Sequence, residues 1–220
     1  MSARVGVVQF PGTNCEFDTV DALRGLGGDA ELLWHGDAEL RGVDAVVVPG
    51  GFAHGDYLRP GAIAQFSPVM NEVVRFANDG GPVLGICNGF QVLTELGLLP
   101  GALQKNAGLK FICQLQELEV VTTDHVLGRE LTVGNRLRIP INHFEGNYVC
   151  SDETAAQLRD EDRIVFRYVD NPNGSVMDIA GVCNASRNVV GLMPHPERAT
   201  SALLGSEDGA RLLSSLVASV

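Results

Sequence analysis

Lysine is almost missing from this chain, because only two of its 16 basic residues are lysines, Lys105 and Lys110. Neither lies in a glycine-rich G-x-x-x-x-G-K loop, which excludes an ATP site of that type. Basic charge is also scarce overall, since 27 acidic residues give a net charge of −11. An acidic surface repels the phosphate backbone, so nucleic acid is excluded as a favourable partner.

Long hydrophobic runs and ordered cysteine patterns are also lacking. No apolar stretch approaches the ~20 residues that cross a bilayer, so we expect no membrane-spanning helix. The five cysteines have irregular spacing, and no basic segment leads into an apolar run at the amino end, which predicts free thiols in a reducing cytoplasmic compartment. Without C-x-x-C or H-x-x-x-H spacing we expect no metal site, and we interpret Cys15 as structural.

The first half of the chain alternates short apolar runs with helical patterns. Strands are predicted at residues 5–9, 30–34, 45–48 and 82–86. Helices are predicted from a capping box at Thr13 and Glu16 to about Leu26, at 68–78 and at 88–96. This alternation predicts a mostly parallel open sheet flanked by helices, in one α/β domain covering residues 1–220.

An added antiparallel region is predicted in the second half. Over residues 111–120 apolar and polar residues alternate, and the phase of this alternation changes partway along, which we interpret as a long strand with a bulge near Gln116. Further strands are predicted at 137–141, 164–168, 182–184 and 189–193, with residues 185–188 turning the last two into a hairpin. A helix over 207–217 completes the chain.

The sequence Gly85-Ile86-Cys87-Asn88-Gly89 predicts a reactive cysteine. It ends an apolar strand and begins a helix, so Cys87 occupies a strand-to-helix elbow whose tight turn requires glycine neighbours. The helix amino end favours thiolate over thiol. A buried structural cysteine is the competing interpretation, and the flanking glycines favour the nucleophile.

A base and its partner are predicted in Met193-Pro194-His195-Pro196-Glu197. The preceding strand delivers His195 to the carboxyl edge of the sheet, and Glu197 is close enough to hold the second ring nitrogen. A surface histidine and a solvated carboxylate are the alternatives. The turn Pro49-Gly50-Gly51-Phe52 exposes backbone N–H groups that, with the N–H of Asn88, are suited to hold an oxyanion.

These features, in this order, resemble the class I, triad-type glutamine amidotransferases. Within that class, nearly the whole chain resembles the glutaminase subunits of phosphoribosylformylglycinamidine synthase. The stretches that carry the resemblance are Phe10-Pro11-Gly12-Thr13-Asn14-Cys15, Pro49-Gly50-Gly51-Phe52, Gly55-Asp56-Tyr57-Leu58-Arg59, Gly85-Ile86-Cys87-Asn88-Gly89-Phe90-Gln91, Asn171-Pro172-Asn173-Gly174-Ser175 and Gly191-Leu192-Met193-Pro194-His195-Pro196-Glu197-Arg198.

The resemblance implies a flavodoxin-like fold and a role for each matching residue. The implied catalytic residues are the nucleophile Cys87, the base His195 and its orienting partner Glu197. The implied oxyanion donors are Gly51 and Asn88. The residues implied to bind glutamine are Gly50, Gln91, His143 and Glu145. Three positions depart from the family pattern: Phe144 occupies a glycine position, His54 stands where an aromatic is usual, and Pro60 replaces a cysteine.

The implied function is hydrolysis of glutamine to glutamate and ammonia through a cysteine thioester. The ammonia is expected to reach a synthetase subunit, which converts formylglycinamide ribonucleotide to the amidine with ATP in de novo purine biosynthesis. A small accessory subunit is expected in the same complex. ATP and Mg²⁺ are expected on the synthetase, and no cofactor on this chain.

Two other functions stay open on the sequence. A cysteine-elbow hydrolase or redox sensor of the DJ-1 type would use a carboxylate such as Glu16 to support the thiol. A flavodoxin-like binding module would hold phosphate at the Thr13-Asn14 loop. Loss of glutamine turnover in His195→Ala distinguishes the amidotransferase from the first alternative, and saturable binding of flavin or nucleotide would support the second.

Overall fold

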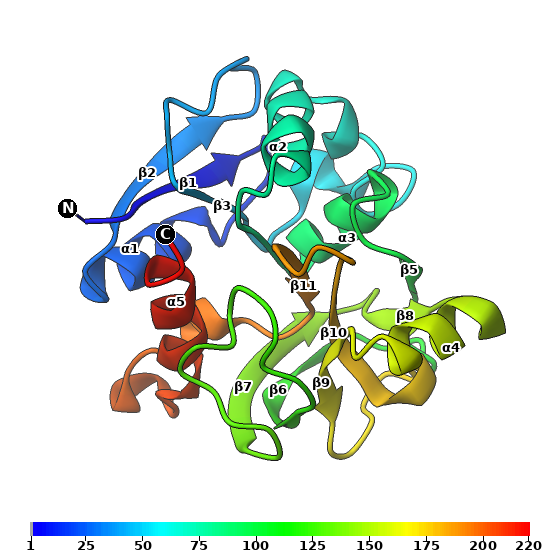
Figure 1. Cartoon of the computed structure of the whole chain (residues 1–220). Helices are drawn as coiled ribbons and strands as arrows, with labels where there is room; N and C mark the ends of the chain where they lie inside the picture. The colour runs from blue at the N-terminus through cyan, green and yellow to red at the C-terminus, as the bar shows by residue number, and fades with distance from the viewer. Residues whose placement is uncertain (1) are drawn as a thin grey trace.

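A nine-stranded mixed sheet runs through the centre of the molecule (Figure 1). The structure is a computed structural model that describes residues 2–220. In spatial order the strands of the sheet are β2 (Asp29–Trp34), β1 (Arg4–Gln9), β3 (Ala45–Val48), β4 (Val83–Ile86), β11 (Val189–Leu192), β10 (Ile179–Cys183), β9 (Ile164–Tyr168), β6 (Ile112–Val120) and β7 (Arg136–His143). A separate antiparallel pair consists of β5 (Ala102–Gln104) and β8 (Asn147–Val149).

The sheet has a parallel part and an antiparallel part. Strands β2, β1, β3, β4 and β11 pair parallel with one another, whereas the pairs β11–β10, β10–β9, β9–β6 and β6–β7 are antiparallel. The hairpin predicted over residues 185–188 joins β10 to β11. The predicted fold class, a mostly parallel sheet with an added antiparallel region, is confirmed.

The parallel strands are apolar because helices cover both of their faces. Every residue of β3, β4 and β11 is buried, and valine dominates these strands, as expected for β-branched side chains between two helical layers. One continuous hydrophobic cluster extends from these strands into β6, β7 and β9.

Five α-helices and five short 3-10 helices accompany the sheet within the described residues 2–220. The α-helices are α1 (Glu16–Gly25), α2 (Pro68–Asn78), α3 (Asn88–Glu95), α4 (Asp152–Asp160) and α5 (Asp208–Val217). The 3-10 helices are η1 (Ala53–Asp56), η2 (Ala64–Phe66), η3 (Val176–Asp178), η4 (Pro196–Arg198) and η5 (Ala202–Leu204). Helices α1 and α5 contact each other on one face of the sheet, and α2 and α3 cover the other (Figure 1). Within residues 2–220, none has the length and apolar character that spanning a bilayer requires.

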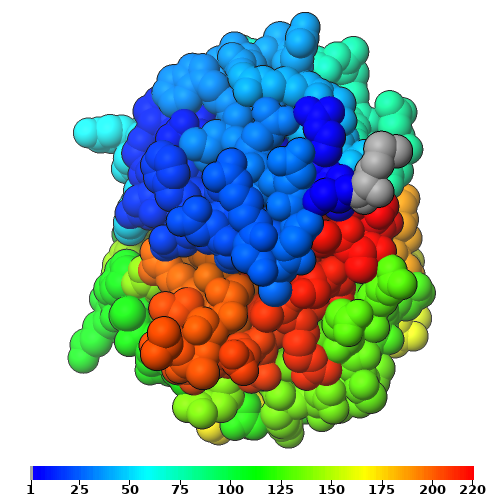
Figure 2. Space-filling view, turned by 90° about the vertical axis from the view of Figure 1, so that its left-hand side faces the viewer, coloured from blue at the N-terminus to red at the C-terminus, as the bar shows by residue number. Residues whose placement is uncertain are grey.

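The carboxyl-terminal segment lies between the amino-terminal part of the chain and the segments near residue 130. Figure 2 shows residues beyond about 190, in orange and red, between the blue amino-terminal part and the green segments near residue 130. Helix α5 contacts α1, η4 and β7, which explains this position. The segment that carries His195 is therefore fixed from both sides.

Three details differ from the sequence predictions. The bulge near Gln116 is absent, because β6 pairs with β7 in unbroken register; the buried Gln116 amide donates to the Asp170 carbonyl at 2.9 Å instead. The prediction of a capping box formed by Thr13 and Glu16 is also wrong. The Glu16 side chain accepts a hydrogen bond from Gln9, and Cys15 is the N-cap residue of α1. Elements α4, β5 and β8 were not predicted.

Candidate active site

Cys87 lies at a strained turn between β4 and α3. Its φ of 49° and ψ of −104° are unusual for a residue with a side chain, and such strain is typical of functional positions. The glycines on either side permit the turn. A Cβ on Gly85 would lie 2.9 Å from the Gly89 carbonyl carbon, and a Cβ on Gly89 would overlap the carbonyl oxygen of Val48. The sequence prediction of a glycine-dependent elbow therefore has a direct steric cause.

His195 and Glu197 form a buried pair at the end of β11. The imidazole Nδ1 lies 2.7 Å from a Glu197 carboxylate oxygen, and both residues are at most 3 % exposed. Burial by itself lowers the pKa of His195, but the carboxylate of Glu197 and the sulfur of Cys87 outweigh it and raise that pKa well above its ordinary value. The site thus favours an imidazolium beside the Glu197 carboxylate.

The sheet register brings Cys87 and His195 into one small pocket. Strand β11 pairs with β4 so that Leu192 lies opposite Ile86, and Cys87 and His195 follow these two strands at the same edge. The pocket has a volume of about 40 Å³. The residues that line it are Asn14, Cys15, Gly51, Phe52, Asp56, Cys87, Gln91, Asn142, His143, Phe144, Glu145 and His195. Ligands of open α/β sheets commonly bind at this carboxyl edge.

Two backbone N–H groups at the pocket are available for an oxyanion. Neither the N–H of Gly51 nor that of Asn88 donates a hydrogen bond within residues 2–220. Asn88 begins α3, where the first N–H groups have no partner inside the helix. Gly51 has a φ of 139°, and a Cβ there would lie 2.7 Å from the Asn14 nitrogen, so only glycine suits this turn.

Gly50 lies behind the imidazole instead of lining the pocket. A Cβ at this position would lie 2.6 Å from Cε1 of His195 and 3.4 Å from the sulfur of Cys15. The missing side chain lets the ring rest against the backbone of the turn. In the structure, Gly50 therefore contacts the base, whereas the sequence placed it among the glutamine-binding residues.

A chain of side-chain hydrogen bonds joins three segments around the pocket. The Asn88 amide accepts from the Ala53 N–H at 3.0 Å and donates to both Asp56 and Gln91 at 2.9 Å. Gln91 in turn donates to the carbonyl of Glu145 at 2.6 Å. These contacts connect η1, α3 and the loop after β7. Asp56 has no role in the sequence prediction beyond its place in a matching stretch, because its partner is distant in sequence.

Buried Asn106 holds the loop of residues 142–146. Its side-chain oxygen lies 3.0 Å from Nδ1 of His143 and accepts from the Gly146 N–H at 3.1 Å, while its nitrogen donates to the His143 carbonyl. Burial, followed by the nearby charge of His195, lowers the pKa of His143 to about 4, so this imidazole is neutral. His143 and Glu145 both line the pocket, as does Phe144. Asn106 was not predicted, because no local sequence signal marks it.

The other two departures from the family pattern lie near η1. His54 packs edge-on against His35, with ring centroids 5.1 Å apart, and its Nε2 lies 3.4 Å from the Ser67 hydroxyl. Pro60 is buried at the start of the turn that follows η1. Neither residue lines the pocket around Cys87.

Cys15 reaches the site although its sequence position indicated only a structural role. Its sulfur lines the pocket and accepts a hydrogen bond from Arg198 at 3.2 Å. Cys15, His195 and Glu197 can each offer one ligand atom, with all three atoms within 4.8 Å of one another. The Arg198 guanidinium adds positive charge beside the same sulfur, which disfavours a cation there.

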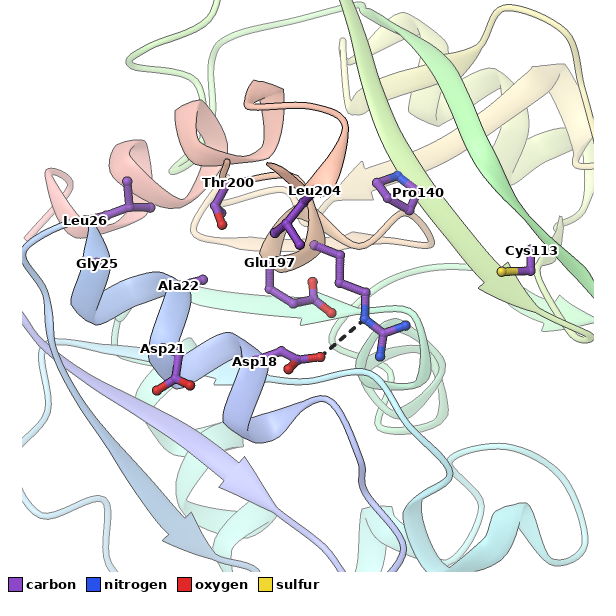
Figure 3. Close-up of a pocket in the computed structure, with 11 residues that line it drawn as sticks. Asp18, Asp21, Ala22, Gly25, Leu26, Cys113, Pro140, Glu197, Thr200 and Leu204 are labelled. Carbon is purple, nitrogen blue, oxygen red and sulfur yellow. Dashed lines mark ion pairs between the residues drawn. The ribbon is translucent and has the colours of Figure 1, made fainter. Parts of the chain in front are cut away.

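A larger pocket lies on the outer side of Glu197 (Figure 3). It measures about 690 Å³ and is bordered by α1, by Pro140 of β7 and by the segment from Glu197 to Leu204. An ion pair between Asp18 and Arg198, 3.4 Å long, crosses it. Among the described residues that line it, Cys113 is the only thiol and there is no histidine. We therefore assign the chemistry to the smaller pocket, which holds Cys87 and His195 together.

The fold and the arrangement of this pocket are those of an α/β glutamine amidotransferase with a cysteine nucleophile. The chain belongs to the CobB/CobQ-like glutamine amidotransferase domain family, whose model matches residues 2–208.

Relatives resemble the chain from end to end. It is 54 % identical over 215 residues to the phosphoribosylformylglycinamidine synthase subunit PurQ of Rubrobacter xylanophilus, covering 98 % of each chain. The protein of the same name from Koribacter versatilis is also 54 % identical, with 97 % of each chain covered. Among solved structures, a chain of PurLQS from Thermotoga maritima has a TM-score of 0.92 and 42 % identity over 99 % of both chains. A putative GMP synthase protein from Thermoplasma acidophilum, at 18 % identity and a TM-score of 0.66, shares the fold, covering 100 % of this chain and 94 % of its own.

Proposed function

We propose that this chain is the glutamine-hydrolysing subunit of phosphoribosylformylglycinamidine synthase. One observation carries the proposal: in a chain similar to PurQ proteins over nearly its whole length, the elbow cysteine and His195 line the same pocket, and buried Glu197 contacts the imidazole from behind that pocket. The proposed catalytic residues are Cys87, His195 and Glu197. Gly51 and Asn88 supply the oxyanion N–H groups, and Gln91, His143 and Glu145 surround the substrate.

In the first step the Cys87 thiolate attacks the side-chain amide carbon of glutamine. The carbonyl oxygen becomes negative, and the N–H groups of Gly51 and Asn88 stabilise it. His195, held as an imidazolium by Glu197, gives its proton to the amide nitrogen as the C–N bond breaks. Ammonia leaves, and the glutamyl group remains on the sulfur as a thioester.

In the second step water replaces the sulfur. His195, now neutral, takes a proton from the water molecule as its oxygen attacks the thioester carbon. The oxyanion is stabilised as before, the carbon–sulfur bond breaks, and glutamate departs. The thiolate and imidazolium are restored, so the cycle consumes one glutamine and one water and releases glutamate and ammonia.

The useful product is the ammonia, which a synthetase subunit uses with ATP to convert formylglycinamide ribonucleotide to formylglycinamidine ribonucleotide. ATP and Mg²⁺ act on that partner, and a small accessory subunit completes the complex. The similar chain from Thermotoga maritima belongs to the PurLQS assembly, whose name supports such a three-component complex. We expect weak glutaminase activity from the chain alone, because uncoupled hydrolysis wastes glutamine.

A single amidotransferase domain over residues 1–220 and a cytoplasmic location complete the proposal. The continuous hydrophobic cluster and the family match over residues 2–208 support the first. Five free cysteines support a reducing compartment, which a thiolate nucleophile requires.

The test uses 6-diazo-5-oxo-L-norleucine, a glutamine analogue whose diazoketone alkylates a nucleophilic thiol with loss of N₂. Peptide mass spectrometry is expected to locate the label on Cys87, and Cys87→Ser is expected to remove both the label and glutamine hydrolysis. The exposed Cys113 is the internal control for unspecific alkylation. Labelling of Cys113 in preference to Cys87 contradicts the proposal.

His195→Ala separates this function from the DJ-1-type alternative. General acid and base catalysis contributes about 10² to 10⁴ in rate, so ammonia release is expected to fall by that factor. A redox sensor would keep its thiol oxidation in this variant, and unchanged ammonia release would exclude the proposed triad. Glu16, the carboxylate that the alternative requires, does not line the Cys87 pocket.

A further inference from the structure

Asp56 is held in the pocket by strained backbone. It ends η1, and three consecutive residues, His54, Gly55 and Asp56, have φ values of 54°, 69° and 50°. Left-handed backbone costs free energy at residues that have a side chain, so a run of it is retained where a side chain must be placed for function. The Asp56 carboxylate is brought to the wall of the pocket that contains Cys87.

The charge of Asp56 is not neutralised within the protein. One carboxylate oxygen accepts from the Asn88 amide at 2.9 Å, and among residues 2–220 no lysine, arginine or histidine forms an ion pair with Asp56. Burial, together with the like charge of Glu145, raises its pKa to about 6, against the lowering effect of the Asn88 hydrogen bond. A carboxylate with these surroundings gains stability when a cationic ligand group binds beside it.

The remaining wall of the pocket offers no competing cation near Asp56. In the part of the chain that the structure describes, no lysine or arginine lines the pocket, and the two acidic side chains that do are Asp56 and Glu145. His143 is neutral, and the charge of His195 is directed to Glu197 and the thiol. A ligand that reacts at Cys87 and carries a positive group is therefore matched by charge on the Asp56 side of the pocket.

We propose that Asp56 binds the α-ammonium group of glutamine and so selects α-amino acid amides over simple amides. This inference rests on the proposed glutaminase function. Asn88 provides the spatial link, because it follows Cys87 directly and its side chain touches Asp56. In glutamine, a short aliphatic chain likewise connects the amide that reacts at Cys87 to the ammonium group that would lie beside Asp56. Asn88 therefore connects the oxyanion site to the ammonium site.

The inference competes with two simpler roles. In the first, Asp56 only positions Asn88 through their hydrogen bond. In the second, Glu145 alone binds the ammonium group. Asp56→Asn separates the first from our proposal, because the new side-chain oxygen can still accept from Asn88 while the charge is lost. Glu145→Gln separates the second.

The experiment compares two reagents on the full chain: 6-diazo-5-oxo-L-norleucine and 6-diazo-5-oxohexanoate, which lacks the ammonium group. Rates of Cys87 alkylation give a preference ratio for each variant. A hydrogen bond to a charged group is worth roughly 10- to 100-fold in binding, so we expect the wild type to prefer the amino reagent by that factor. Asp56→Asn is expected to lose most of the preference and to react normally with the deamino reagent. Asp79→Asn, an exposed carboxylate at the end of α2, is the matched control.

Each contrary outcome overturns a different statement. If Asp56→Asn keeps the wild-type ratio, Asp56 does not bind the ammonium group, and loss of the ratio in Glu145→Gln alone would assign that role to Glu145. Equal slowing with both reagents would identify Asp56 as a positioning residue for Asn88. If Asp56→Asn fails to fold, the preference ratio is measured instead on Asp56→Ser, which also keeps a hydrogen-bond acceptor and removes the charge. Failure of the wild type to react at Cys87 with either reagent would instead refute the glutaminase function.

Discussion

Replacing Gly50 with alanine is expected to slow catalysis without preventing substrate binding. The added Cβ would lie 2.6 Å from Cε1 of His195, whereas ordinary van der Waals contact begins at 3.4 Å. The imidazole must therefore move by about 1 Å, since the turn behind it is backbone, and such a displacement of a catalytic group costs on the order of 10²-fold in rate. We expect kcat for glutamine to fall by about that factor, with little change in KM.

The measurement is ammonia release by the complete complex, as a function of glutamine concentration. Gly108→Ala is the matched control, because a Cβ there meets no atom within 4 Å. Thermal unfolding of both variants checks that they are folded. A kcat for Gly50→Ala within twofold of the control would refute the steric reasoning. A rise in KM alone would instead restore Gly50 to the glutamine-binding role predicted from the sequence.

Two further predictions concern stability. Burial lowers the pKa of His125 to about 4, below its unfolded value of 6.5, so the unfolded chain binds more protons between these values and stability should fall by up to about 3 kcal/mol as pH decreases from 6.5 to 4. Urea unfolding at several pH values should show a smaller decrease for His125→Gln, and identical pH profiles would contradict this assignment. Asn106→Ala leaves His143 and the Gly146 N–H without their buried partner, which is expected to cost about 1–3 kcal/mol for each group. A loss below 1 kcal/mol in urea unfolding would show that the loop does not depend on Asn106.

Local pattern predicted the elements that combine strong periodicity with turn residues. Helix α2 has the predicted bounds, and the strand-to-helix elbow at Cys87 is where the glycines indicated. The sequence predicted that the strand before His195 delivers the imidazole to the carboxyl edge of the sheet, and the parallel pairing of β11 with β4 places that edge beside Cys87.

The misses have physical causes. Helix α4 is polar, so its apolar periodicity is weak, and its one clear signal is the Ser151 cap that accepts from the Thr154 N–H. Strands β5 and β8 have three residues each, too few for an alternating pattern. The phase change in β6 indicated a bulge, but a buried glutamine at position 116 satisfies its amide through Asp170. Long-range hydrogen bonds of this kind also define Asp56 and Asn106, and no local signal announces them.

The central location of β11 has a consequence for biosynthesis of the protein. This strand separates β4 from β10, yet it is made of residues 189–192, so a chain still emerging from the ribosome lacks the middle of its own sheet. Until β11 has been made, the edge of β4 that it covers stays unpaired. An unpaired strand edge promotes aggregation of the incompletely folded chain. Since the same segment brings His195, a nascent chain cannot hydrolyse glutamine before this strand and the residues that follow it have been made.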